Sequence, residues 1–231
     1  MALHEGSYGQ YCPISRALDV LGERWSLLIV RDLLCGHHRF NELARGNPRL
    51  SRSLLAKRLR QLESAGIVER LGTDYALTPA GEELRPLVFG LGEWGAKWQF
   101  GDPREHELDA ELLMWWAHDR IDFAAFSARR AVLEFRFRDD SRRFWIVNDS
   151  VGPSVCTADP GFDVDLLVTT DVATMYRIWL GSLDLRDAQR QGTIELCGPP
   201  AVLRRVPDLF LLSPVAHMVV ATRPESATSL A

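Results

Sequence analysis

The residues best suited to chemistry in this sequence form a short basic stretch. Residues 39–60 hold seven arginines and lysines against one acid, Glu42, although the whole chain of 231 residues has a net charge of −4. Residues 101–231 carry 14 basic and 20 acidic side chains, so the average over the chain hides a local positive region. Such a region is the electrostatic footprint of phosphate binding. The alternative is a solvated helix face that happens to be basic, and charge alone favours neither.

The spacing of these residues predicts a helix with two chemically different faces over residues 51–65. Leu55, Leu59 and Leu62 recur at i, i+4 and i+7, which is the apolar stripe of an amphipathic helix. Ser51 can cap the start of this helix. At about 100° per residue, the opposite face carries side chains of the types that reach phosphates and base edges in a major groove: Ser53, Lys57, Arg60 and Gln61.

Patterns of other site chemistry are absent from the sequence. There is no Gly-rich phosphate loop and no HExxH, GxSxG or EF-hand pattern, so we expect neither an enzyme nor a cofactor. The six histidines lack the spacing of metal ligands, and the adjacent His37 and His38 are predicted in a loop, solvated or in contact with phosphate. The four cysteines are widely spread without a CxxC pair, which argues against a zinc ribbon or a disulfide scaffold and favours a reducing compartment.

The elements that must position the basic helix follow a recognisable order in the first half of the chain. The expected elements are helices over residues 14–21 and 24–35, a short helix near Phe40, the basic helix, strands over 67–70 and 75–78 around the turn Gly72-Thr73-Asp74, and a helix from Pro79 to Trp98. This order is the winged helix-turn-helix layout, mainly α with a β-hairpin wing. In that layout the basic helix lies in the major groove, and the wing lies beside the DNA backbone or the minor groove.

The same half of the chain resembles a known family. The segments CPISRALDVLGERWSLLIVRDLL, HRFNELARGNPRLSRSLLAKRLRQLESAGIVER and YALTPAGEELRP are similar to the HxlR-type branch of the MarR-like winged-helix regulators. The resemblance covers about residues 10–98. It implies a homodimer, built partly through the N- and C-terminal helices of this domain, that binds a pseudo-palindromic operator on double-stranded DNA. Members of the family usually end soon after the last helix, whereas about 130 residues follow here.

From the helix pattern and the resemblance together, we expect seven residues to contact DNA. Five belong to the basic helix and the turn before it, and two belong to the wing, where they touch the backbone: Arg49, Arg52, Ser53, Lys57 and Arg60, and then Arg70 and Thr73.

Cys12 is a candidate for redox chemistry. It precedes Pro13 at the start of the first predicted helix, and a helix N-terminus lowers the pKa of a thiol. The resemblance adds that a cysteine near this position is common in the family, and that some members use it to sense oxidants or electrophiles. The alternative is a structural role, as a half-buried thiol at the dimer contact.

The second half of the chain differs from the first. A polar segment with Gly and Pro, residues 99–105, marks the expected boundary between a domain of residues 1–100 and one of residues 107–225. Within the second domain, Leu133, Phe135 and Phe137 alternate with charged residues, which is the pattern of a half-buried strand. Further strand and helix signals predict an α+β domain with an antiparallel sheet and helices packed on one side.

Part of this second domain resembles the sterol-carrier-protein lipid-binding family. The resemblance is carried by FDVDLLVTTDVATMYRIWLGSLDLRDAQRQGTIELCGPPAVLRRV. It implies a fatty-acyl or other apolar ligand in a tunnel between the sheet and the helices. The candidate lining residues are Phe135, Phe137, Met175, Trp179 and Leu180. The alternative is that these side chains are ordinary core.

Taken together, the sequence predicts a dimeric, DNA-binding transcriptional regulator whose second domain binds an apolar effector. No apolar run approaches the roughly 18 residues that span a bilayer, and the N-terminus lacks the pattern of a secretory signal, so we expect a cytoplasmic protein with no membrane partner. Two alternatives remain. The second domain could be a lipid-carrying or dimerising module without an inducer role, or the chain could act through protein contacts with weak DNA binding.

Overall fold

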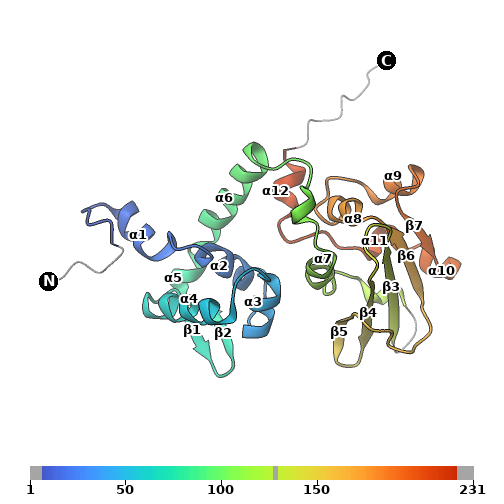
Figure 1. The fold of residues 1–231 in the computed structure, drawn as a ribbon, viewed down its shortest axis with the longest axis horizontal. Coiled ribbons are helices and arrows are strands. Elements are labelled where there is room, and N and C mark those ends of the chain that lie inside the picture. Colours follow the sequence, from blue (N-terminus) through green and yellow to red (C-terminus); the bar gives the residue numbers. More distant parts are fainter. Residues whose placement is uncertain (1–6, 127–129, 223–231) are drawn as a thin grey trace, which may run out of the picture. The chain divides into compact units, whose positions relative to one another are not determined.

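The structure is a computed structural model that describes residues 7–126 and 130–222. The chain forms two compact units, residues 1–91 and 92–231, which we describe separately (Figure 1). The division falls inside a helix, before the polar segment 99–105 where we expected the domain boundary. The physical reason is that the end of this helix packs into the second unit, where a Cβ on Gly92 would collide with the sulfur of Met218.

The first unit contains helices and one hairpin in the predicted order. Its elements are α1 (Pro13–Leu21), α2 (Ser26–Leu34), α3 (Phe40–Gly46), α4 (Arg52–Ser64), β1 (Val68–Leu71), β2 (Asp74–Leu77), α5 (Pro79–Glu82) and the start of α6 (Arg85–Trp98). The predicted apolar stripe of the basic helix is confirmed, because Leu55, Leu59 and Leu62 are fully buried. They pack with the apolar faces of α2 and α3 into a single core.

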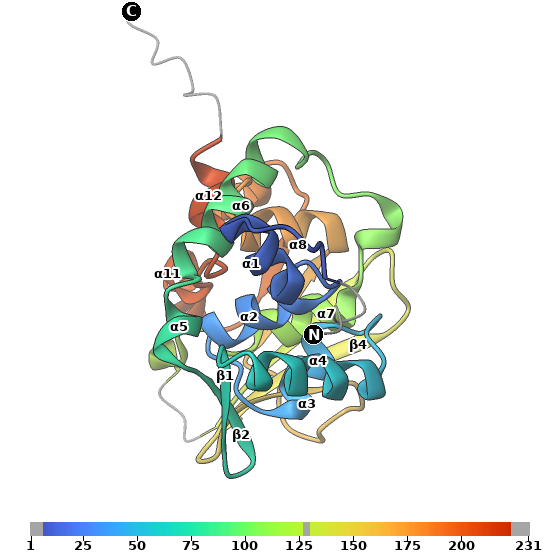
Figure 2. The same cartoon turned by 90° about the vertical axis from the view of Figure 1, so that its left-hand side faces the viewer.

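The strands β1 and β2 pair antiparallel through four residue pairs, from Val68↔Leu77 to Leu71↔Asp74. Gly72 has φ +65° at the turn, a left-handed conformation that glycine adopts without steric cost. In Figures 1 and 2 the hairpin projects away from the helices of the first unit. An isolated bridge between Arg39 and Asp74 ties the chain before α3 to the hairpin.

The single long helix expected from Pro79 to Trp98 is wrong. The structure has two helices there, a short α5 and a longer α6, which are separated at Glu83 and Leu84. Pro86 explains the break, because it has no N–H to donate to the carbonyl of Glu82 and its ring opposes continuation of the preceding turn.

The second unit is a five-stranded sheet with helices. Its elements after α6 are the 3₁₀ turn η1 (Glu105–Glu107), α7 (Ala110–Ala117), the 3₁₀ turn η2 (Phe123–Ala125), β3 (Ala131–Phe137), β4 (Arg143–Asp149), β5 (Gly152–Cys156), β6 (Leu166–Thr170), α8 (Val172–Trp179), α9 (Leu185–Arg190), β7 (Glu195–Cys197), α10 (Pro200–Leu203), α11 (Val206–Leu209) and α12 (Ala216–Val220). The alternating residues of β3 separate two faces. One face packs with α7 and α8 in the main core, and the other carries a small cluster of Val132, Trp145 and Val147.

The expectation of an antiparallel sheet needs a correction. The strand order is β5-β4-β3-β6-β7, and β3 pairs parallel with β6 from Leu133↔Leu166 to Phe137↔Thr170. The chain from β5 to β6 crosses to the far side of β3 and enters β6 at the end where β3 begins. Alternation identifies a strand by its own side chains, but the direction of its neighbour depends on this distant connection.

The elements of both units are short. Among residues 7–126 and 130–222, none of the helices combines the length and apolar character needed to cross a bilayer.

Candidate nucleic-acid interface

The start of α4 is set by local hydrogen bonding. Ser51 has extended backbone geometry, and its hydroxyl accepts a hydrogen bond from the backbone N–H of Leu54 at 3.3 Å. This is the predicted cap, which satisfies one of the free N–H groups of the first turn. The helix therefore begins at Arg52 and turns its apolar stripe into the core, which leaves the opposite side for solvent.

All seven predicted DNA contacts lie on the surface of the first unit. Ser53, Lys57 and Arg60 share the solvent side of α4. Within the part of the chain that the structure describes, neither Lys57 nor Arg60 makes an ion pair, so both cationic groups are available to a phosphate. Arg49 is exposed in the turn before α4.

Arg52 and Arg70 are exposed but held in place. Arg52 donates a hydrogen bond to Asn41 at 2.5 Å, and its guanidinium lies 5.1 Å from the centre of the Phe40 ring. Arg70 donates to the carbonyl oxygen of Gly72 at 3.1 Å in the hairpin turn, next to Thr73. These contacts limit the freedom of both guanidinium groups and therefore lower the entropy that they lose on binding a phosphate.

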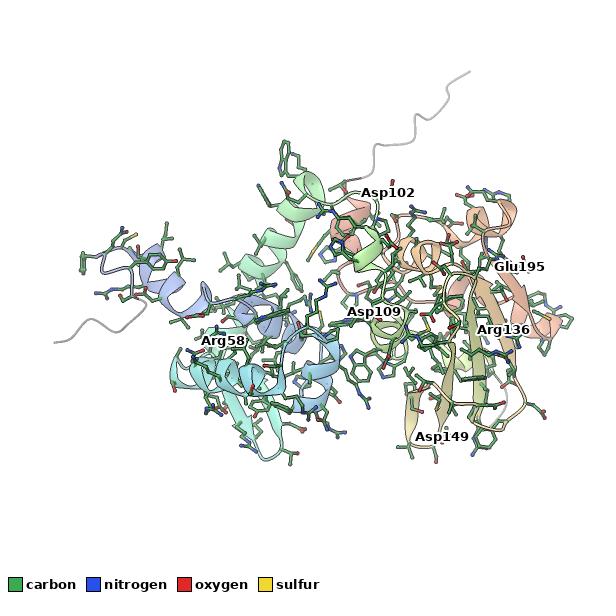
Figure 3. All side chains as sticks on the ribbon, viewed as in Figure 1. Arg58, Asp102, Asp109, Arg136, Asp149 and Glu195 are labelled. Atoms are coloured by element: carbon green, nitrogen blue, oxygen red, sulfur yellow. The ribbon has the colours of Figure 1, made fainter. Side chains whose placement is uncertain are left out.

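Arg58 belongs to the basic stretch but not to the exposed face. It is buried and donates hydrogen bonds to the backbone oxygen of Arg24 at 3.1 Å, to Gln61 at 2.7 Å and to Glu23 at 2.5 Å. Figure 3 shows it among the elements of the first unit. Arg58 thus anchors α4 to the loop before α2. The signal was in the sequence, because position 58 lies between Leu55 and Leu62 on the same side of the helix.

A buried polar network holds the turn that leads into α4. The carboxylate of Asp32 on α2 is fully buried, and it accepts a hydrogen bond from Asn47, at the end of α3, at 2.5 Å. Arg31 pairs with it at 2.6 Å. Burial raises the pKa of Asp32, and the charge of Arg31 opposes this. The prediction that His37 is solvated is wrong, because it is buried beside this network, whereas His38 is exposed.

Cys12 lies at the N-cap of α1, in extended conformation and half-buried. The backbone N–H groups of Ser15 and Ile14 lower the pKa of its thiol, because they stabilise the thiolate by hydrogen bonding.

The candidate lining residues of the second domain lie in different surroundings. Phe135, Phe137 and Met175 are buried in the main core, and Trp179 is packed against it. The indole N–H of Trp179 is buried without a hydrogen-bond partner among the described residues. Leu180 alone of the five lines a hollow of about 630 Å³, which the end of α6, the segment after it, α8 and α12 enclose.

The first unit therefore defines a class of protein, the helix-turn-helix regulators, with a capped helix that is apolar inside and basic outside. Comparison with known proteins identifies the family. The family model "HxlR-like helix-turn-helix" matches residues 20–102. The HTH-type transcriptional regulator YvaP of Bacillus subtilis is 36% identical over 97 residues, which cover 38% of this chain and 90% of YvaP. The chain belongs to the HxlR family of transcriptional regulators, and it is a regulator rather than an enzyme.

Two further relatives cover the same part of the chain. The HTH-type transcriptional regulator sll1512 of Synechocystis is 35% identical over 97 residues, which cover 39% of this chain and 72% of that protein. The solved structure of the reduced form of the transcriptional regulator YodB from B. subtilis is 34% identical, with a TM-score of 0.34, and covers 39% of this chain and 96% of YodB.

Proposed function

We propose that this protein is a dimeric one-component regulator, which binds a pseudo-palindromic operator through residues 1–100 and a small molecule through residues 107–225. The observation that carries the proposal is the geometry of α4, whose leucine side is buried while its cationic side is exposed. In this proposal α4 enters the major groove, where Arg49, Arg52, Ser53, Lys57 and Arg60 contact the operator. The β1–β2 hairpin serves as the wing, and Arg70 and Thr73 touch the backbone beside it.

Two exposed apolar surfaces support the homodimer. On α6, Leu87, Leu91, Trp94 and Trp98 recur at i, i+4, i+7 and i+11, and each side chain is more than half exposed. On and before α1, three further apolar side chains are exposed: Tyr11, Ile14 and Leu18. Large apolar side chains that gather on one helix face are typical of an interaction surface. A two-fold dimer would present two copies of α4 to two half-sites.

The second unit binds the ligand in this proposal. Its sheet-and-helix architecture supports the resemblance to the lipid-binding family. The hollow lined by Leu180 includes the end of α6, which is the helix that leads out of the DNA-binding half. An effector can act only if its affinity differs between the DNA-competent and incompetent states. The alternative is a lipid-carrying or dimerising module without an inducer role.

A selection of binding sites from random double-stranded DNA tests the proposal as a whole. The expected result is a site with two inverted half-sites, whose centres are about 10–10.5 base pairs apart or a multiple of that distance. Recovery of no enriched sequence would contradict operator binding. Recovery of a single half-site would contradict the dimer.

Cys12 is a second regulatory candidate, favoured by its position at a helix N-cap. Because the pKa of its thiol is lowered, more thiolate is present below pH 8.5 than for an ordinary cysteine, so alkylation by iodoacetamide should reach its plateau at a lower pH. Peptide mass spectrometry would measure this at Cys12 alone. Titration with diamide is expected to weaken operator binding by the wild type and to leave Cys12→Ser unaffected. Equal responses of the two proteins would exclude the redox role and leave the structural one.

A further inference from the structure

The hollow in the second unit is built by stretches of chain that lie far apart in the sequence. Its walls come from residues 96–107, residues 176–182 and residues 219–222. Its volume of about 630 Å³ lies within the range of small-molecule sites, about 300–1,000 Å³. A molecule in this hollow would contact the end of α6 and the segment behind it, as well as α8.

Part of the wall is apolar. Phe100, Leu180 and Val219 line it, together with Tyr176. The hydroxyl of Tyr176 donates a hydrogen bond to the backbone oxygen of Asp109 at 3.1 Å, and burial raises the pKa of this hydroxyl. Because the hydroxyl already has a partner, the Tyr176 ring is free to serve as an apolar surface for a ligand.

The rest of the wall is mainly polar, and its charged side chains are two arginines and two acids: Arg104, Arg177, Asp102 and Glu107. The Glu107 carboxylate accepts a hydrogen bond from the backbone N–H of Arg104 at 2.9 Å. The guanidinium of Arg177 on α8 lies 2.8 Å from the carboxylate of Asp102. Asp102, which is labelled in Figure 3, belongs to the segment that follows α6. The two side chains are 40% and 87% exposed, so their ion pair contributes little and can exchange. Within the described residues the guanidinium of Arg104, also in the lining, makes no ion pair.

We propose that the hollow binds an amphipathic anion. Its apolar body lies against Phe100 and Leu180, and its carboxylate or sulfonate takes the place of Asp102 on Arg177. A guanidinium can bind such an anion through two parallel hydrogen bonds, which gives the contact both strength and orientation. This inference rests on the ligand-dependent regulation proposed above and names the chemical class of its ligand.

The exchange on Arg177 has a consequence for the segment after α6. The Asp102 carboxylate accepts a hydrogen bond from Arg177 and so joins this segment to α8. A bound anion removes that tie and occupies the surface beneath the segment. Because an exposed ion pair contributes little, operator binding with and without the ligand is the measurement that decides whether this exchange acts on the chain that leads from the DNA-binding half.

Titration of the full chain with 1-anilinonaphthalene-8-sulfonate, an amphipathic anion, tests the proposal by fluorescence. N-phenyl-1-naphthylamine has the same ring system without the sulfonate and serves as the neutral probe. We expect Arg177→Gln to weaken binding of the anionic probe about tenfold, since a charged hydrogen bond is lost. We expect Asp102→Asn to strengthen it by about two- to fivefold, since the competing carboxylate of an exposed pair is removed.

Matched controls separate this effect from a general change in charge or fold. Arg186→Gln removes an exposed arginine on α9, outside the lining, and is expected to leave both probes unaffected. The neutral probe should bind Arg177→Gln and Asp102→Asn equally well. The thermal unfolding midpoint of each variant should match that of the wild type.

The test is decisive because the two substitutions are expected to change the affinity for the anionic probe in opposite directions. Weakening by both Arg177→Gln and Asp102→Asn, or no effect of either, would overturn the proposal. The same proteins are then assayed for operator binding with and without the anionic probe. Probe binding as expected with an unchanged operator affinity would uphold the ligand class and contradict the effector role, which leaves the lipid-carrying alternative.

Discussion

Replacement of Lys57 and Arg60 together by alanine is expected to weaken operator binding roughly 100-fold. Each side chain is exposed on the same side of α4 and lacks an ion-pair partner among the described residues, so each is free to contact DNA. A lost contact of this kind costs about 1–3 kcal/mol. If both side chains contact phosphates, the slope of log K against log salt should fall by about 0.9 for each. Mobility shift at several salt concentrations measures both quantities.

A matched variant keeps this test specific to α4. Arg186→Ala with Arg204→Ala removes the same charge from exposed positions of the second unit, and it should leave operator affinity and its salt slope unchanged. All four substituted residues, Lys57, Arg60, Arg186 and Arg204, are exposed. The free energy of unfolding should therefore change by less than about 0.5 kcal/mol per substitution. An unaltered affinity and slope in the Lys57 and Arg60 variant would show that α4 is not the recognition helix. That result would favour regulation through protein contacts.

Replacement of both Leu91 and Trp94 by glutamate is expected to convert the proposed dimer into a monomer at micromolar concentrations. Leu91 is 52% and Trp94 is 54% exposed in the single chain, so glutamate at these positions should not disturb the fold. In a dimer interface the same substitutions would bury two charges on each subunit without partners, at a cost of several kcal/mol. Sedimentation equilibrium would measure the mass. Affinity for a two-half-site operator should fall to that for a single half-site.

The control for this second prediction uses the same helix. Arg85→Gln with Lys97→Gln changes the net charge by the same amount at exposed positions outside the apolar stripe, and the dimer should persist. A dimer of unchanged mass with glutamates at Leu91 and Trp94 would place the interface elsewhere. The exposed side chains on and before α1, led by Tyr11 and Ile14, would then be the next surface to test.

The basic helix could be predicted because its signals are local. The leucine repeat, the cap at Ser51 and the polar residues between them all lie within 15 residues, and helix geometry relates them directly. The hairpin around Gly72 was predictable for the same reason. The break at Pro86 and the buried position of Arg58 are also local, because the first follows from the proline itself and the second from the helix period.

Other features depend on residues that meet only in the folded chain. The hydrogen bond between Asp32 and Asn47 joins two helices, and no spacing pattern in the sequence predicts it. The parallel pairing of β3 with β6 depends on the path of the chain between them, which includes the strands β4 and β5. The five residues predicted to line a tunnel are all apolar, and apolar character alone does not separate a core residue from a pocket residue. Phe135 therefore lies in the core, while Leu180 lines the hollow.

The sequence by itself determined the amphipathic helix over residues 51–65 and the order of elements around it. Through these it also determined the membership in a family of DNA-binding regulators. Those properties follow from hydrophobic period, capping and turn chemistry, which act over a few residues. Only the tertiary structure decided which part of the chain Arg58 anchors and where a ligand could enter. Arg58 is buried because the loop before α2 meets α4, and the hollow exists because three distant stretches of chain enclose it.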